Sequence, residues 1–131
     1  MKTEPKFNPL VPELTVSNLE KSRYFYEVVL GFRIVYSRSD FYFLEKQGAQ
    51  IMITTDGYDV GELEAPRGRG INFEIEVENI DPLLKALEEK AYPLWRQAQA
   101  CRYDCGGVEV TGRQFLVQDP DGYLLRFSSA Q

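Results

Sequence analysis

The segment ELTVSNLE, residues 13–20, recurs 61 residues later as EIEVENID, residues 74–81. In both copies apolar residues occupy the second and fourth positions, and an asparagine is followed by an aliphatic and then an acidic residue. The alternation predicts a half-buried strand, and the residues around the asparagine are typical of a junction between a strand and a helix. Any two such junctions share some features, but the matching order of residues favours an internal duplication.

The chain around the first copy predicts one β-α-β-β-β module. A capping box at Ser17 and Glu20 starts its helix. The helix ends at Leu30, because Gly31 suits a left-handed C-terminal cap. The strands of this module are expected over residues 10–16, 32–37, 41–45 and 50–55.

The second copy begins an equivalent module after a linker, residues 56–70, that contains four glycines and one proline. Asp81 is expected as the N-cap of its helix and Pro82 as the first helical residue. The extra residues 97–111 are expected to form a long loop, which is either a lid or binding loop or a mobile insertion. The strands are expected over residues 71–77, 92–96, 114–118 and 123–128, with a tight turn at Asp119-Pro120-Asp121-Gly122.

The two modules predict an α+β fold. With 131 residues, of which 44% are hydrophobic and 27% charged, the chain is long enough to bury a core without disulfides or a structural metal. We expect a single domain, residues 1–131, that contains modules at about 10–55 and 71–128 joined by the glycine-rich linker.

Charge and residue types exclude several classes of function. The net charge of −5 disfavours nucleic acid as a partner. The chain contains no histidine, so Ser–His and Cys–His nucleophile systems are absent, and a metal site would need carboxylates, amides or thiolates. Two cysteines are too few for a disulfide scaffold, and no apolar run reaches membrane-spanning length. We therefore expect a cytoplasmic protein with no membrane partner.

Two segments resemble a known family. The first is residues 11–22, followed by Phe25-Tyr26 and Leu30-Gly31-Phe32; the second is GRQFLVQDPDGYLLRF, residues 112–127, with its D-P-D-G turn. They resemble the vicinal oxygen chelate superfamily, which includes glyoxalase I, extradiol dioxygenases, fosfomycin-resistance enzymes and bleomycin-resistance proteins. The resemblance runs from about residue 10 to the end, and it implies that the two modules form a curved mixed sheet with a concave cleft.

In the metal-dependent members of this superfamily, four residues on the concave face hold a divalent ion. The resemblance places these positions at Val11, Met52, Asn72 and Arg126, which do not form a ligand set. It therefore implies a protein with no metal, cofactor or catalytic residue, closest to the metal-free bleomycin-resistance proteins. Those proteins bind a drug in grooves at a dimer interface, and Val11-Pro12 resembles the hinge of their exchanged N-terminal strand. We expect a homodimer with such an exchange, unless Pro12 only marks an edge strand.

Strand alternation assigns further residues to the cleft. Once Asn72 is set on the concave face, alternation also places there Glu13, Thr15, Gln50, Met52, Thr54, Glu74, Glu76, Leu124 and Arg126. Three carboxylates against one guanidinium attract a cationic or polar ligand. The alternative is that the glutamates face open water and that Arg126 pairs with Glu13 or Glu74.

Aromatic rings would offer a planar ligand a stacking surface. The resemblance implies a drug-stacking aromatic on the strand of Phe41 and Tyr42, with core packing as the alternative, and this chain has Thr111 where the bleomycin-resistance proteins have a tryptophan. Cys101 and Cys105 are either simple thiols or a redox-sensitive clasp over the cleft. The aromatic candidates are Phe41, Tyr42, Tyr58, Trp95 and Tyr103.

We therefore predict a metal-free small-molecule binding protein of the bleomycin-resistance type, which sequesters a cationic or polar aromatic compound such as bleomycin. The predicted ligand-binding residues are Glu13, Phe41, Tyr42, Met52, Asn72, Glu74, Glu76, Trp95, Tyr103 and Arg126. The first alternative is a lyase or isomerase of the same superfamily that uses Glu13, Glu74 or Glu76 as a base. The second is a structural or regulatory dimer with a vestigial cleft.

Overall fold

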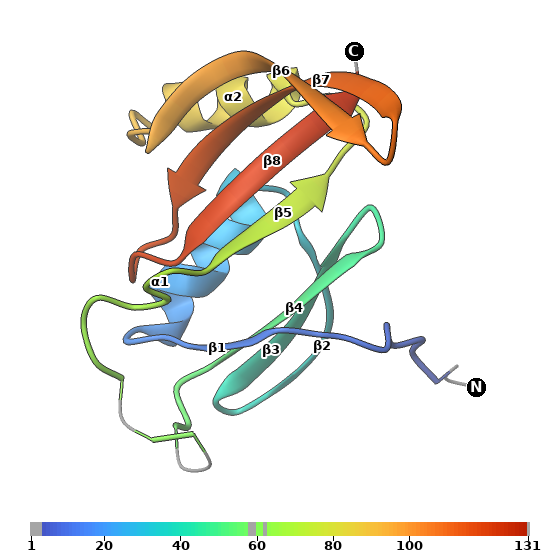
Figure 1. Ribbon diagram of the computed structural model, residues 1–131. Helices are drawn as coiled ribbons and strands as arrows, with labels where there is room; N and C mark the ends of the chain where they lie inside the picture. Colours follow the sequence, from blue (N-terminus) through green and yellow to red (C-terminus); the bar gives the residue numbers. More distant parts are fainter. Residues whose placement is uncertain (1–3, 58–59, 62, 131) are drawn as a thin grey trace. The chain divides into compact units, whose positions relative to one another are not determined.

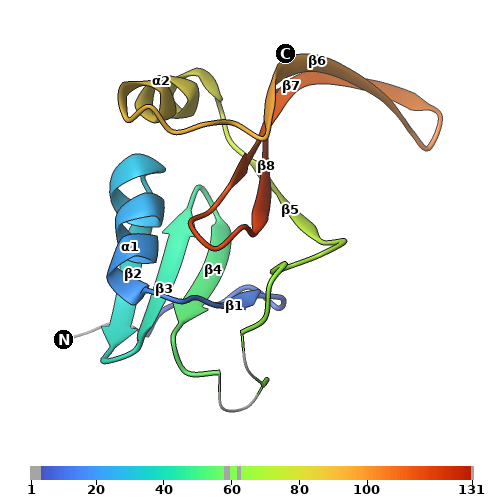
Figure 2. The ribbon, with the colours of Figure 1, turned by 90° about the vertical axis from the view of Figure 1, so that its left-hand side faces the viewer.

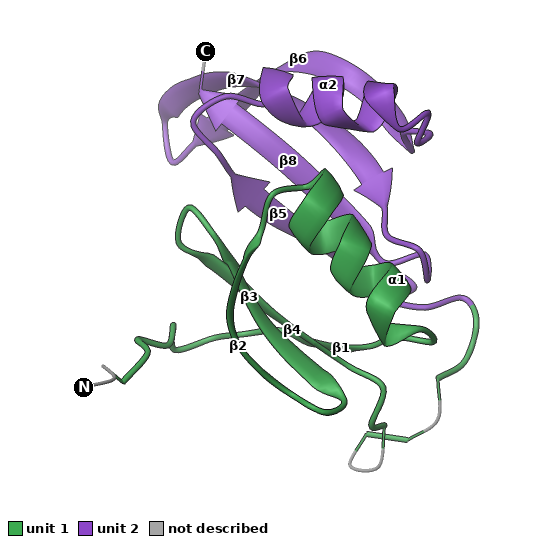
Figure 3. Cartoon of the chain, turned by 180° about the vertical axis from the view of Figure 1, so that it is seen from behind, with its two compact units in different colours: residues 1–65 green, residues 66–131 purple. Residues whose placement is uncertain are grey.

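The computed structural model describes residues 4–57, 60–61 and 63–130 (Figure 1). The chain divides into two compact units, residues 1–65 (unit 1) and residues 66–131 (unit 2), which Figure 3 shows in different colours. The boundary falls inside the predicted linker, residues 56–70.

Unit 1 is a β-α-β-β-β module. Its described residues form a four-stranded sheet in the order β1-β4-β3-β2, in which β1 and β4 are parallel and the other neighbours are antiparallel. A short α-helix continues directly into a π-helix between β1 and β2. The elements are β1 (Glu13–Thr15), α1 (Leu19–Arg23), η1 (Tyr24–Val29), β2 (Arg33–Arg38), β3 (Phe41–Lys46) and β4 (Ala49–Thr54).

Unit 2 has the same succession of elements and the same topology. Its described residues form a four-stranded sheet in the order β5-β8-β7-β6, in which β5 and β8 are parallel. The matching strand order confirms the predicted α+β fold of two equivalent modules. The elements are β5 (Asn72–Glu76), α2 (Asp81–Glu89), β6 (Arg96–Cys105), β7 (Val108–Gln118) and β8 (Leu124–Ala130).

The repeated asparagine accepts a backbone hydrogen bond at the start of the helix in both units, but only Asn18 is the N-cap residue. The Oδ1 atom of Asn18 accepts a hydrogen bond from the backbone N–H of Lys21 at 3.0 Å, so the N-cap is Asn18 and the predicted capping box at Ser17 is wrong. The Oδ1 atom of Asn79 accepts from the backbone N–H of Asp81 at 2.9 Å. The N-cap of α2 is Ile80 and Asp81 is its first residue, so this helix begins one residue earlier than predicted.

Alternation along the strands correctly separates the buried face from the open face. Leu14 and Val16 in unit 1, and Ile75 and Val77 in unit 2, are buried. At the alternate positions Glu13, Glu74 and Glu76 are exposed, and Thr15 is half-buried. In the core of unit 2, the rings of Phe115 and Phe127 stack with centroids 5.5 Å apart.

The predicted loop over residues 97–111 is wrong, because these residues form most of a long hairpin. β6 continues to Cys105, which pairs with Val108 across a two-residue turn. Gly106 and Gly107 have φ angles of +68° and +89°, as the tightest hairpin turns require. Within the described residues, β7 pairs with β8 only from Gly112 to Gln118, so the end of the hairpin continues past β8 (Figure 2).

The D-P-D-G turn between β7 and β8 is confirmed. Asp119 is 3% exposed, and its Oδ1 atom accepts the backbone N–H groups of Asp121 and Tyr123, both at 2.9 Å. The N–H of Gly122 donates to the Asp119 carbonyl at 2.9 Å. In the described part of the chain, none of the helices has the length and apolar character that a membrane crossing requires.

Candidate functional site

The open face of the unit 2 sheet carries the largest group of predicted site residues. Cross-strand pairing places Glu74 beside Arg126, and Gln114 beside Ser128. The opposite face holds Phe115 and Phe127 and is approached by α2, since Arg113 bonds to Asp81 of that helix at 3.0 Å. We call the open face the polar face of unit 2; its members are Asn72, Glu74, Glu76, Cys101, Tyr103, Gln114, Arg126 and Ser128.

A hollow of about 120 Å³ opens on this polar face. It brings together three predicted site residues, Glu74 and Glu76 from β5 and Tyr103 from β6. It therefore combines carboxylates with an aromatic ring, as the sequence predicted for a ligand site. The residues that line it are Glu74, Glu76, Cys101, Tyr103, Val110, Thr111, Gly112, Gln114, Ser128, Ser129 and Ala130.

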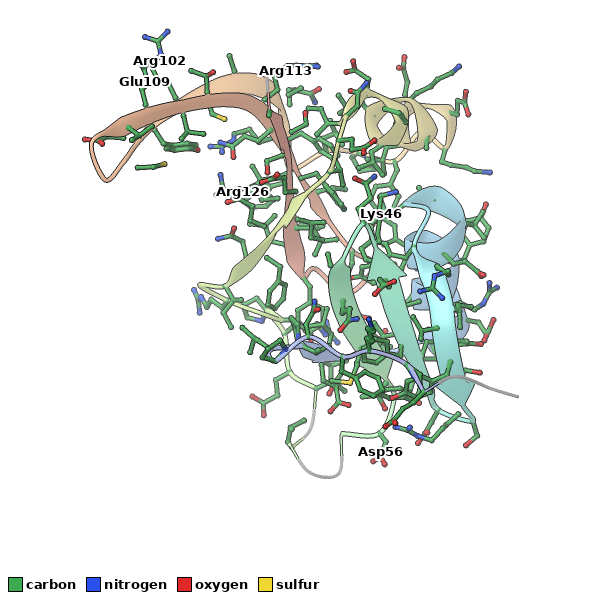
Figure 4. All side chains as sticks on the ribbon, turned by 90° about the vertical axis from the view of Figure 1, so that its right-hand side faces the viewer. Lys46, Asp56, Arg102, Glu109, Arg113 and Arg126 are labelled. Carbon is green, nitrogen blue, oxygen red and sulfur yellow. The ribbon has the colours of Figure 1, made fainter. Side chains whose placement is uncertain are left out.

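A chain of hydrogen bonds crosses the polar face from β5 to β6. The Nε atom of Arg126 (labelled in Figure 4) donates to Oδ1 of Asn72 at 3.2 Å, and its Nη1 atom donates to Oε1 of Gln114 at 3.2 Å. The Nε2 atom of Gln114 donates to the hydroxyl oxygen of Tyr103 at 2.6 Å. Arg126 is thus bonded to two amide oxygens and, within the described part of unit 2, makes no salt bridge with Glu74.

The two glutamates of the hollow keep most of their hydrogen-bonding capacity. Glu74 accepts one hydrogen bond, from the hydroxyl of Ser128 at 3.1 Å. Glu76 makes no hydrogen bond or ion pair with any of the described residues, and both side chains are exposed. Two unneutralised carboxylates on one strand face create a negative field that attracts a cation.

Three other predicted residues share the open face of the unit 1 sheet. Glu13 pairs with Met52, and Phe41 pairs with Thr54 on the same side. Phe41 is only 3% exposed, because the guanidinium of Arg38 lies 4.0 Å from its ring centroid and Tyr36 stacks beside it at 5.7 Å. The ring that the resemblance offers for stacking is therefore covered by side chains of β2.

Tyr42 lies on the opposite face of unit 1. Its hydroxyl donates to Oε1 of Glu20 on α1 at 2.9 Å, and this hydrogen bond raises the pKa of Tyr42. The pKa of Glu20 is lowered mainly by the hydrogen bond from Arg23, and to a lesser extent by the one from Tyr42. Adjacent residues of a strand face opposite sides, so only Phe41 of this pair shares the open face with Glu13.

Trp95 stands apart from the hollow of the polar face. Trp95 is 62% exposed just before β6, and its backbone N–H donates to the Leu116 carbonyl at 2.8 Å. It does not line the hollow of the polar face. Tyr58 lies outside the described residues.

The N-terminal segment lies on β4 of its own unit. The Nε2 atom of Gln50 donates to the Lys6 carbonyl at 2.9 Å, and its Oε1 atom accepts the backbone N–H of Asn8 at 2.7 Å. Asn8 also donates from its side chain to the Gly48 carbonyl at 2.8 Å. Between them, Phe7 contacts the ring of Phe43 with centroids 5.2 Å apart.

The residues at the superfamily's metal positions do not fit a divalent ion. Asn72 and Arg126 are hydrogen-bonded to each other, so a guanidinium occupies the place where a second oxygen or nitrogen ligand would be needed. Val11 and Met52 offer no hard donor atom. Among the described residues, no three His, Cys, Asp or Glu side chains gather closely enough to hold a metal.

A larger hollow of about 590 Å³ lies beside α2 and contains none of the predicted residues. Its walls are mostly apolar, with Glu88 as its one carboxylate. Tyr92 borders it and donates its hydroxyl to the Gln118 carbonyl at 2.6 Å; burial, and secondarily Asp119, raises the pKa of Tyr92 to about 12. This hollow has one carboxylate and the hollow of the polar face has two, so the larger hollow attracts a polar cation less strongly.

Gln114 and Ser128 are the polar-face residues that sequence reasoning missed. The alternation that selected Leu124 and Arg126 extends to Ser128, which is the next residue of that parity on β8. Antiparallel pairing then places Gln114 opposite Ser128. Cys101, which the sequence predicts in a loop as a simple thiol or part of a clasp over the cleft, lies instead on β6 opposite Gly112.

A family model described as the Glyoxalase/Bleomycin resistance protein/Dioxygenase superfamily matches residues 6–127. The chain belongs to this superfamily. No curated protein matches the sequence significantly.

Solved structures show the same fold at low sequence identity. TioX from Micromonospora sp. ML1 has a TM-score of 0.74 at 17% identity, over 95% of this chain and 100% of that chain. A glyoxalase-related enzyme from Fulvimarina pelagi has a TM-score of 0.72 at 23% identity, over 93% and 87%. A glyoxalase/bleomycin resistance protein/dioxygenase from Alicyclobacillus acidocaldarius has a TM-score of 0.64 at 20% identity, over 94% and 91%. These likenesses support the fold alone.

Proposed function

We propose that this member of the superfamily binds and sequesters a cationic or polar aromatic small molecule, such as bleomycin, as a metal-free homodimer. The observation that carries the proposal is the hollow of the polar face, where the carboxylates of Glu74 and Glu76 lie beside the ring of Tyr103. Sequestration needs only complementary contacts, and the proposal assigns no catalytic residue.

Charge supports a cationic ligand. The guanidinium of Arg126 on the polar face donates to Asn72 and Gln114 and forms no ion pair with the two described glutamates, whose charges outnumber it two to one. The chain also has a net charge of −5, which adds a long-range attraction for cations.

Shape and exposure support an aromatic or otherwise flat ligand. Tyr103 is 49% exposed, and Val110, its partner across the hairpin, is exposed beside it. An aromatic ring with one accessible side favours stacked or edge-on contacts with a planar group. Because the hollow is small, it accommodates one end group of a compound as large as bleomycin.

Calorimetric titration with metal-free and with copper-loaded bleomycin tests the proposal. We expect saturable binding at one drug per chain. Glu76→Gln is expected to weaken binding about two- to fivefold, the range for the loss of one exposed ion pair. Glu89→Gln is the matched control, since it removes the same charge from an exposed position on α2.

Two results would argue against sequestration. The absence of binding by either form of the drug would leave the ligand unidentified and remove the support for bleomycin. Equal losses in Glu76→Gln and Glu89→Gln would show that net charge, and not the hollow, attracts the drug. Turnover of a substrate that disappears in Glu74→Gln, with binding retained, would instead support the lyase or isomerase alternative.

A further inference from the structure

The hydrogen bonds around Tyr103 determine whether its hydroxyl acts as a donor or as an acceptor. A guanidinium has only donors, so the Gln114 atom that faces Arg126 at 3.2 Å is the carbonyl oxygen. The amide nitrogen of Gln114 must then face Tyr103, at 2.6 Å. The hydroxyl oxygen of Tyr103 therefore accepts a hydrogen bond from Gln114, and its own proton is left for another acceptor.

None of the described residues takes that proton, and Tyr103 lines the hollow together with Glu74 and Glu76. We infer that Tyr103 donates a hydrogen bond to the ligand and so selects, among cationic compounds, those that carry a hydrogen-bond acceptor. The inference rests on the proposed function, because it assigns a selectivity to the same hollow.

Gln114 and Arg126 act on the ligand through Tyr103, as positioning residues. Gln114 is only 5% exposed, and Arg126 is itself held by Asn72 at 3.2 Å. If the amide of Gln114 turned over, its NH₂ group would face the guanidinium, and two donors would meet without an acceptor. The orientation of this buried amide thus fixes the Tyr103 hydroxyl as a donor.

The size of the hollow limits the group that enters it. A cavity of roughly 150 Å³ holds a benzene ring, so the hollow of about 120 Å³, which is open to solvent, takes no more than one ring. The ligand class is therefore a compound with a single-ring end group that bears both a protonated amine, for the glutamates, and a neutral acceptor atom, for Tyr103.

Four small amines provide the test. Benzylamine carries the ring and the cation but no acceptor, whereas 2-, 3- and 4-(aminomethyl)pyridine add a ring nitrogen that accepts a hydrogen bond at neutral pH. Titrations of the whole protein, followed by amide NMR shifts, give the four dissociation constants. We expect at least one pyridine isomer to bind about two- to tenfold more tightly than benzylamine, the gain expected from one neutral hydrogen bond.

Two variants and a control trace the preference to Tyr103. Tyr103→Phe keeps the ring and removes the donor, so the preference should disappear. Gln114→Glu should also abolish it, because a carboxylate accepts the Tyr103 proton and turns the hydroxyl into an acceptor for the ligand. Gln99→Glu adds the same charge at the exposed partner of Gln114 on β6 and should keep the preference.

The outcomes separate this inference from the proposed function. If benzylamine binds and weakens in Glu76→Gln, but no pyridine isomer is preferred, the inference fails and the cation site stands. A preference that survives in Tyr103→Phe also overturns the inference. If none of the four amines binds, the inference and the cation site both fail. Should Gln114→Glu not fold, Tyr103→Phe decides alone, because its side chain lies on the exposed hairpin.

Discussion

Asp119 is a buried carboxylate whose contribution to stability can be measured against an exposed counterpart. Its Oδ1 atom accepts two backbone N–H groups at 2.9 Å in the turn between β7 and β8. Asp119→Ala leaves both donors without this partner, so we expect the free energy of unfolding to fall by about 2–3 kcal/mol. Urea unfolding followed by circular dichroism gives the value.

Asp104 is the matched control for this prediction. Its Oδ1 atom accepts the backbone N–H of Gly107 at 2.7 Å in the turn between β6 and β7, but the residue is exposed. Water replaces the lost acceptor there, so Asp104→Ala should cost less than about 1 kcal/mol. Equal losses in the two variants would show that burial does not set the cost of breaking these turns.

For a single residue, the sequence predicts which face of the sheet the side chain occupies better than it predicts the hydrogen-bonding partner of that side chain. Alternation correctly placed Glu74, Glu76 and Arg126 on the polar face, because side-chain direction follows from the backbone. The partner of Arg126 depends on which strand lies beside β8. β8 lies between β5, which supplies Asn72, and β7, which supplies Gln114, and no local pattern around residue 126 specifies these neighbours.

At the level of elements, the predicted strand over residues 92–96 is wrong, because β6 begins only at Arg96 and continues to Cys105. Most side chains of β6 are exposed, so the pattern that marks a core strand is absent. Signals were nevertheless present. Cys101, Tyr103 and Cys105 alternate with charged residues, and Gly106-Gly107 is a typical two-residue hairpin turn.

The end of this hairpin should be the least protected part of the unit 2 sheet. Residues 102–111 pair only with each other among the described residues, whereas residues 113–117 of β7 lie between β6 and β8 (Figure 2). An exposed salt bridge between Arg102 and Glu109 at 2.8 Å adds little stability there (Figure 4). Amides of residues 102–110 should exchange with solvent at least about tenfold faster than those of residues 113–117.

Hydrogen exchange followed by mass spectrometry or NMR measures this difference in one experiment. The buried residues Phe115 and Val117 supply the internal reference for full protection. Equal protection in the two ranges would mean that another surface covers the hairpin in solution. Tyr103 lies within residues 102–110, so this measurement also reports how firmly the hollow of the polar face is held before a ligand arrives.

For the whole molecule, duplication explains why the fold could be predicted so fully. Two segments 61 residues apart lead to sheets of identical strand order, β1-β4-β3-β2 and β5-β8-β7-β6. A correct prediction of the first module therefore also predicts the strand order of the second. The position of the N-terminal segment follows from contacts that strand periodicity does not describe, such as those of the buried residue Gln50.

The proposed dimer with exchanged N-terminal segments gives the last prediction. Gln50 and Gly48 bind the backbone of Lys6 and the side chain of Asn8 through bonds that stay the same whichever copy of the chain supplies the segment. Exchange thus conserves these contacts while joining two copies. Light scattering should give twice the 15.1 kDa of the chain. Removal of residues 1–9 should give a monomer, whereas removal of residues 1–4 should not. A full-length monomer, or a dimer unaffected by the longer deletion, would disprove the exchange.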